Sequence, residues 1–147
     1  MELKKSEEVL AEIHRNCELA LQSISNILPE TEDNELREEL MRQHEEYEKI
    51  GGRAAIIAKD KGIELKNPSC MKKAMMWSSI KMNTLVDDSR SHIAEMMVQG
   101  TVMGITALKS SLGEMSEDES DEDIKALAEE LLQIEENFEK TWKNMIA

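Results

Sequence analysis

Hydrophobic residues recur every three or four positions over two long segments in the first half of the chain, the spacing of one face of an α-helix. The first segment covers about residues 3–28 and ends at Pro29. The second covers about residues 32–61, and Thr31 or Asp33 can cap its start. The apolar stripes are Leu10, Ile13, Cys17, Ala20, Ile24 and Ile27 in the first segment, and Leu36, Leu40, Gln43, Tyr47, Ile50, Ala54 and Ile57 in the second.

Two further segments, at about residues 91–112 and 121–145, repeat this spacing. No position in any of the four stripes is Asp or Glu. The four stripes therefore predict a core without inward carboxylates, where a hard cation would find no ligands. The stripes of these two segments are Ile93, Met97, Gly100, Gly104, Ala107 and Ser111, and Ile124, Leu127, Leu131, Ile134, Phe138, Thr141 and Met145.

A shorter amphipathic stretch, about Cys70–Leu85, lies in the long connection between the second and third segments. Asp87-Asp88-Ser89 supplies capping oxygens and favours a break there, although a helix continuous with the next segment is the alternative. The short link at Pro29 makes the first two helices antiparallel, and the long connection permits a crossover. The fold class is thus all-α: an up-down four-helix bundle whose long crossover carries a short extra helix.

Length and composition support this prediction and narrow the partners. The chain has 147 residues, the size of a single domain, and only four are aromatic. Because 31 acidic residues oppose 18 basic ones, the net charge of −13 disfavours nucleic acid and anionic membranes. No apolar run approaches the ~20 residues of a membrane span, so we expect a cytoplasmic protein. Cys17 and Cys70 indicate neither a zinc site nor a disulfide framework.

Five short segments give the chain a family likeness: Cys17–Ile24, Asn34–Leu40, Gln43–Tyr47, Trp77 with Lys81, and Ile93–Glu95 with Gly100. In this arrangement the chain resembles the ferritin-like superfamily, in particular small bacterial ferritin-like proteins. Where the site is intact, the resemblance implies a di-iron or di-manganese centre for oxidation or iron handling. Its ligands are a Glu from each of two helices and a Glu-x-x-His from each of the others.

The chain departs from that pattern on three of the four long helices. His44 and Tyr47 stand where the motif of the second helix needs Glu and His, and no carboxylate lies at Gly100. The last helix offers Glu135 without a His. The resemblance therefore implies a degenerate site and no metal. If iron or manganese is bound after all, the rearranged ligand set is Glu18, His44, Tyr47 and Glu135.

Each of the three histidines is followed by an acid three or four residues later, a spacing that suits one edge of a metal site or an ordinary surface contact. His44 lies at the edge of its stripe, either in a polar pocket between helices or as a hydrogen-bonded boundary residue. Gly100 and Gly104 indicate a close helix approach or, alternatively, a small-ligand cavity. The histidine pairs are His14 with Glu18, His44 with Glu48, and His92 with Glu95.

Methionines are concentrated between residues 71 and 103. Thioether side chains adapt to irregular surfaces, so they predict a partner-binding face, unless they only cover the open side of the bundle. A homodimer satisfies both interpretations. The candidate partner-binding residues are Met71, Met75, Met76 and Met82, with Met96, Met97 and Met103 in the next segment.

No arrangement of nucleophile and base and no phosphate-binding glycine loop is evident. The sequence therefore predicts a non-catalytic helical bundle with a structural or protein-interaction role, without a cofactor and with a second copy or another protein as partner. The alternative is a di-iron or di-manganese carboxylate protein with the rearranged ligands.

Overall fold

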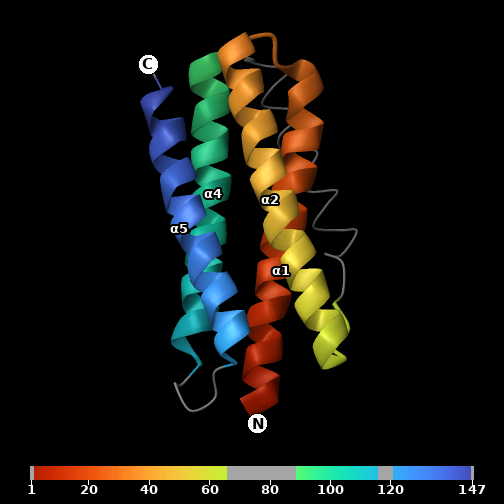
Figure 1. Ribbon diagram of the computed structural model, residues 1–147. Helices are drawn as coiled ribbons and strands as arrows, with labels where there is room; N and C mark the ends of the chain where they lie inside the picture. The colour runs from red at the N-terminus through yellow and green to blue at the C-terminus, as the bar shows by residue number, and fades with distance from the viewer. Residues whose placement is uncertain (1, 66–88, 116–120, 147) are drawn as a thin grey trace.

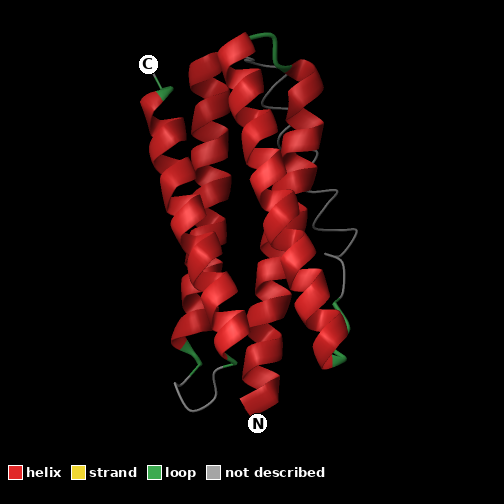
Figure 2. Ribbon diagram, viewed as in Figure 1, coloured by secondary structure: helices red, strands yellow, loops and turns green. Residues whose placement is uncertain are grey.

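Four long α-helices lie side by side in the computed structural model, which describes residues 2–65, 89–115 and 121–146 (Figure 1). Helices account for nearly all of these residues, and no strand occurs among them (Figure 2). The predicted all-α class is confirmed. The predicted short helix at about residues 70–85 lies outside the described residues. The elements are α1 (Glu2–Ile27), a 3-10 turn (Leu28–Glu30), α2 (Asn34–Lys61), α4 (Arg90–Gly113) and α5 (Glu122–Asn144).

The ends of the helices match local signals in the sequence. Asp33 caps α2 by accepting a hydrogen bond from the backbone N–H of Leu36 at 3.0 Å. Gly62 ends α2 with a φ of 68°, a left-handed conformation that glycine adopts without strain. Ser89 is extended and caps α4, so the predicted break before the third long helix is confirmed. Asp121 caps α5.

Ion pairs at the two ends establish how the helices run. Arg90, the first residue of α4, pairs with Asp33 at the start of α2 at 2.7 Å. Lys61 at the end of α2 pairs with Asp121 before α5. Helices α2 and α4 therefore run in one direction and α1 and α5 in the other, as the colours in Figure 1 show. The main contacts join α1 to α2 and α4 to α5.

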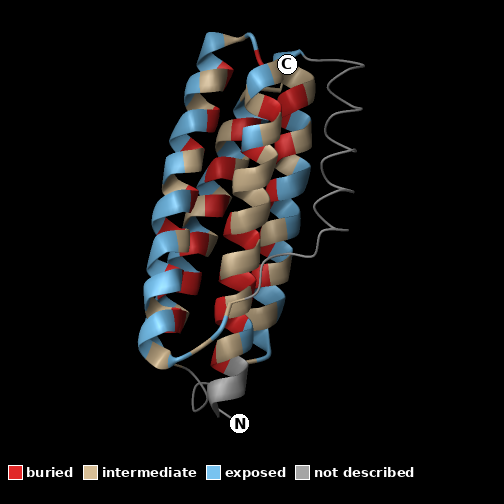
Figure 3. Ribbon diagram, turned by 90° about the vertical axis from the view of Figure 1, so that its right-hand side faces the viewer, coloured by how far each residue is buried: buried red, intermediate tan, exposed pale blue. Residues whose placement is uncertain are grey.

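One apolar core runs between the helices, which turn their buried faces inward (Figure 3). In α1 every predicted stripe residue is buried except Ala20, which is half-buried. In α2 the prediction holds except that Ala58 is buried where Ile57 was expected. The stripes of the first two helices are thus confirmed almost completely. No helix in the described part of the chain is both long and apolar enough to cross a lipid bilayer.

The predicted stripes of α4 and α5 are wrong in their second halves. The predicted positions alternate by three and four residues, an average of 3.5, whereas an α-helix turns once in 3.6 residues. In α5 this mismatch of about 20° per seven residues turns the predicted stripe away from the core, and a period of 3.6 residues counted from Ile124 reaches Glu135 after three turns. In α5 Phe138 is buried as predicted, but Glu135 and Trp142 are buried in place of Ile134 and Thr141, and Met145 is half-buried. In α4 the buried residues after Met97 are Thr101, Ile105 and Leu108 instead of Gly100, Gly104, Ala107 and Ser111.

The prediction of a core without inward carboxylates fails with this shift. Glu135 is 1% exposed, and Asn16, Gln43 and Thr101 are also buried. Buried polar groups are tolerated only where they are hydrogen-bonded. The question is therefore what binds the carboxyl group of Glu135.

Candidate functional site

A polar cluster lies halfway along the helices, and each of the four contributes one residue. Asn16 comes from α1, Tyr47 from α2, Gly104 from α4 and Glu135 from α5. We call these four residues the central cluster. Two of its members, Tyr47 and Glu135, belong to the ligand set predicted for the alternative metal site.

Hydrogen bonds link all four members of the central cluster. The Tyr47 hydroxyl donates to Oε2 of Glu135 at 2.8 Å, and Nδ2 of Asn16 donates to Oε1 at 2.8 Å. The same Nδ2 also donates to the backbone carbonyl of Gly104 at 3.1 Å. Both oxygens of the carboxyl group therefore accept bonds from neutral donors of the same chain.

Gly104 provides the space for this arrangement. A Cβ atom at this position would lie 2.7 Å from Oδ1 of Asn16 and 2.9 Å from Oε2 of Glu135, closer than real contacts allow. The predicted close helix approach is therefore present at Gly104, against the polar side chains of Asn16 and Glu135. Gly100 is exposed and has open space around its Cβ position.

The environment of Glu135 favours its protonated form. Burial raises the pKa of this carboxyl group from 4.5 to about 7, although the bonds from Tyr47 and Asn16 oppose the shift. The charge of Glu12, which is also buried and paired with Arg15, raises the pKa further. No ion pair among the described residues involves Glu135. The site can therefore hold or release a proton near neutral pH.

The neighbouring groups stay neutral. Burial and then the charges of Glu135 and Glu18 raise the pKa of the Cys17 thiol to about 12. Burial, together with the charge of Glu135 and the hydrogen bond to it, raises the pKa of Tyr47 well above its usual value. Because only thiolates and phenolates are strong nucleophiles, neither group is chemically activated.

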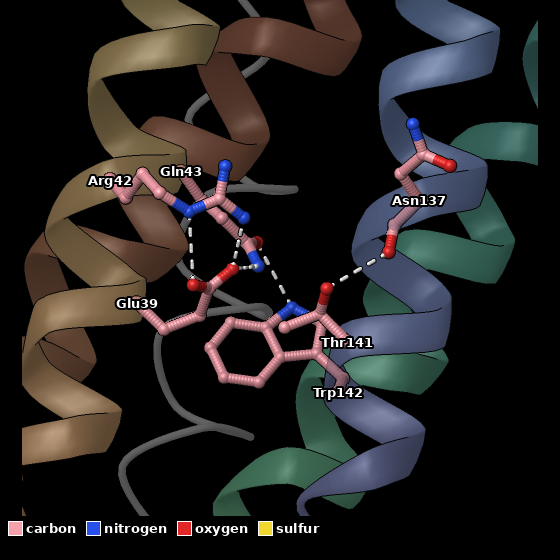
Figure 4. Close-up of polar contacts among 6 residues, drawn as sticks. All are labelled: Glu39, Arg42, Gln43, Asn137, Thr141 and Trp142. Atoms are coloured by element: carbon pink, nitrogen blue, oxygen red, sulfur yellow. Dashed lines mark hydrogen bonds and ion pairs between the residues drawn. The ribbon is translucent and has the colours of Figure 1, made fainter.

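A second polar network joins α2 to α5 closer to the C-terminus of α5 (Figure 4). The indole N–H of Trp142 donates to Oε1 of Gln43 at 3.0 Å, and Nε2 of Gln43 donates to Glu39 at 2.9 Å. Glu39 also accepts from Nε of Arg42 at 3.0 Å, and the Arg42 guanidinium lies 5.5 Å from the centre of the Phe138 ring. Gln43, the one polar residue predicted in the α2 stripe, thus binds a buried tryptophan.

The structure brings only part of the predicted metal set together. Tyr47 and Glu135 are in direct contact. His44 is half-buried beside α1, where its Nδ1 is 2.8 Å from Oε1 of Glu48 and its Nε2 is 3.5 Å from the Ser25 hydroxyl. Glu18 is half-buried on α1. Within the described ranges, no three His, Cys, Asp or Glu side chains are grouped to hold a metal ion.

The methionines of the predicted partner-binding face that the structure describes differ in burial. Met97 is buried and Met96 packs against the core, whereas Met103 is 72% exposed. The remaining predicted partner-binding residues lie outside the described residues: Met71, Met75, Met76 and Met82.

Sequence reasoning missed Asn16 and the inward orientation of Glu135. A helical period of 3.6 counted from Ile124 reaches Glu135 and Trp142, so that orientation was detectable. Asn16 gives no such signal, because it lies between the stripe residues Ile13 and Cys17. The chain matches no protein-family model, and no curated protein or solved structure is significantly similar to it.

Proposed function

We propose that the protein is a non-catalytic, ferritin-like bundle with a degenerate metal site and a role in protein–protein contact or structural support. The observation that carries the proposal is the central cluster. Its carboxyl oxygens are occupied by the Tyr47 hydroxyl and the Asn16 amide, both donors of hydrogen bonds. These bonds use two of the roughly four lone-pair positions of the carboxylate, and neither donor side chain is a carboxylate that would balance the charge of a cation.

The directions of the helices support the ferritin-like part of the proposal. Helices α1 and α5 run in the opposite direction to α2 and α4. The end of α2 and the start of α4 therefore lie at opposite ends of the structure (Figure 1). A bundle with one long crossover has this arrangement. The acidic charge of the chain supports a protein that binds neither nucleic acid nor anionic membranes, and we propose that it is cytoplasmic.

The contact between Tyr47 and Glu135 favours one alternative, a di-iron or di-manganese carboxylate protein. The residues do not fit such a centre well. Tyr47 is a protonated phenol, and His44 forms its bonds with Glu48 and Ser25, outside the central cluster. A hard divalent cation needs several carboxylates, whereas the central cluster offers one.

Metal analysis tests the proposal. Protein purified without chelator should contain far less than one iron or manganese per chain, and adding ferrous iron should cause no oxygen consumption above a buffer control. About two bound ions per chain, removed by Glu135→Gln and retained by Glu129→Gln, would overturn it. Glu129 is the matched control because it is exposed on the same helix.

A further inference from the structure

The outer face of α4 differs from the rest of the described surface. Its core-facing residues leave the opposite side of the helix exposed. Val102 and Met103, which are 38% and 72% exposed, are neighbours on this side. The other large hydrophobic residues exposed in the described part of the chain, Met41 and Ile56, lie apart from each other on α2. We define the outer face of α4 as Glu95, Gln99, Gly100, Val102, Met103, Thr106, Lys109 and Ser110.

This face is almost free of acidic charge. None of the thirteen residues between Glu95 and Lys109 is charged, in a chain with a net charge of −13. Helix α4 has two basic residues, Arg90 and Lys109, and one acid, Glu95, and it is the only described helix in which bases outnumber acids. By contrast, α5 has seven acids and three bases. Two copies of the chain therefore meet the least repulsion at α4.

The two charges of the outer face are placed symmetrically. Glu95 precedes Val102 by seven residues, and Lys109 follows it by seven. At 100° per residue, the fourteen steps from Glu95 to Lys109 are about 40° less than four complete turns of the helix. The two charges therefore lie on the same side of α4. Neither residue forms an ion pair with another described residue.

This spacing suits a second copy of the same chain. When two identical helices pack antiparallel about a two-fold axis, residues equally far from the axis face each other. With the axis at Val102, Glu95 of each copy lies opposite Lys109 of the other, and the uncharged residues meet between these pairs. Gly100 has open space at its Cβ position, which allows the second helix to come close.

We propose that the outer face of α4 binds the same face of a second copy in antiparallel orientation. This inference rests on the proposed role in protein contact and supplies its partner. A basic partner would be attracted to the acidic faces, above all that of α5. The outer face of α4 instead offers apolar area between two opposite charges, Glu95 and Lys109. The surface of a single helix is at the small end of specific interfaces, so we expect a reversible dimer.

Sedimentation velocity over a range of about 1–200 µM tests the contact. The protein should shift from monomer to dimer as its concentration rises. Met103→Glu places a charge in the middle of the face and should weaken self-association at least about tenfold. Met41→Glu, a matched change at a residue that is 56% exposed on α2, should leave it unchanged.

Charge reversal tests the antiparallel orientation. Glu95→Lys alone and Lys109→Glu alone should each weaken the dimer, because like charges then face each other. The two substitutions together in one chain should restore it. An equimolar mixture of the two single variants should form a heterodimer. Circular dichroism shows whether each variant is folded.

Two results would overturn the proposal: a monomer at every concentration, or a dimer that Met103→Glu leaves intact although the variant is folded. A protein that stays monomeric would show that a second copy does not bind the outer face of α4. Failure of the double charge reversal to restore association would overturn the antiparallel orientation. The metal and oxygen measurements separately decide whether the protein is non-catalytic.

Discussion

Glu135→Gln should change how the stability of the protein depends on pH. The substitution keeps the shape of the side chain but removes its ionisation. In the folded protein the pKa of Glu135 is about 7, compared with 4.5 for a solvated glutamate. Because the folded state binds this proton more tightly, the contribution of Glu135 to stability is greatest below about pH 4.5. It is lost as the pH rises to about 7.

The size of the effect follows from the same two values. A difference of about 2.5 pKa units corresponds to about 3 kcal/mol in the free energy of unfolding, at about 1.36 kcal/mol per unit. Above pH 7 the folded wild type contains a buried carboxylate with only the neutral donors Tyr47 and Asn16. The amide of the variant avoids this charge. We therefore expect the variant to gain up to about 3 kcal/mol relative to the wild type between about pH 5 and pH 8.

Urea unfolding followed by far-ultraviolet circular dichroism measures the difference at each pH. The other carboxylates titrate in both proteins, so subtracting one curve from the other isolates Glu135. The control Glu129→Gln makes the same chemical change at an exposed position of α5 and should show no pH-dependent difference. If the difference between wild type and Glu135→Gln is the same at pH 5 and pH 8, the carboxyl group is not held in the environment that we describe.

Three further substitutions or reagents examine the core. Gly104→Ala brings a Cβ to 2.7 Å from Oδ1 of Asn16 and should lower the free energy of unfolding by about 1–3 kcal/mol. Urea titration measures the change, and an unchanged midpoint would show that no close approach exists. In a Cys70→Ser background, Cys17 is the only thiol that can react with an aromatic disulfide. Because burial raises its pKa to about 12, it should react about a thousandfold more slowly in the folded than in the unfolded protein. Equal rates would contradict its burial. Trp142→Phe leaves Oε1 of Gln43 without its donor and should lower the free energy of unfolding by about 1–3 kcal/mol. Thermal unfolding measures this loss, and a melting curve identical to that of the wild type would contradict it.

Most of the fold could be predicted from local signals. The stripes of α1 and α2, the Asp33 cap and the glycine at residue 62 depend on residues close together in the sequence. The candidate site was harder to predict. A small error in helical period is harmless over two turns, but after three turns it placed Glu135 on the wrong side of α5.

The central cluster shows what local reasoning could not reach. Tyr47 and Glu135 are 88 residues apart in the chain, and Asn16 and Glu135 are 119 apart. Helix periodicity describes which side of one helix is buried, but not which residue of another helix faces it. The prediction of a core without carboxylates failed because its α5 stripe missed Glu135. The partners of Glu135 come from α1 and α2, so the pattern of α5 alone could not identify them.

The sequence by itself determined the helices, their capping residues and the acidic charge of the protein, because each of these depends on residue type and short-range spacing. Only the tertiary structure decided that a carboxyl group occupies the middle of the core with a pKa near neutrality. Burial and hydrogen bonding depend on atoms that side-by-side packing of the helices brings together from distant parts of the chain.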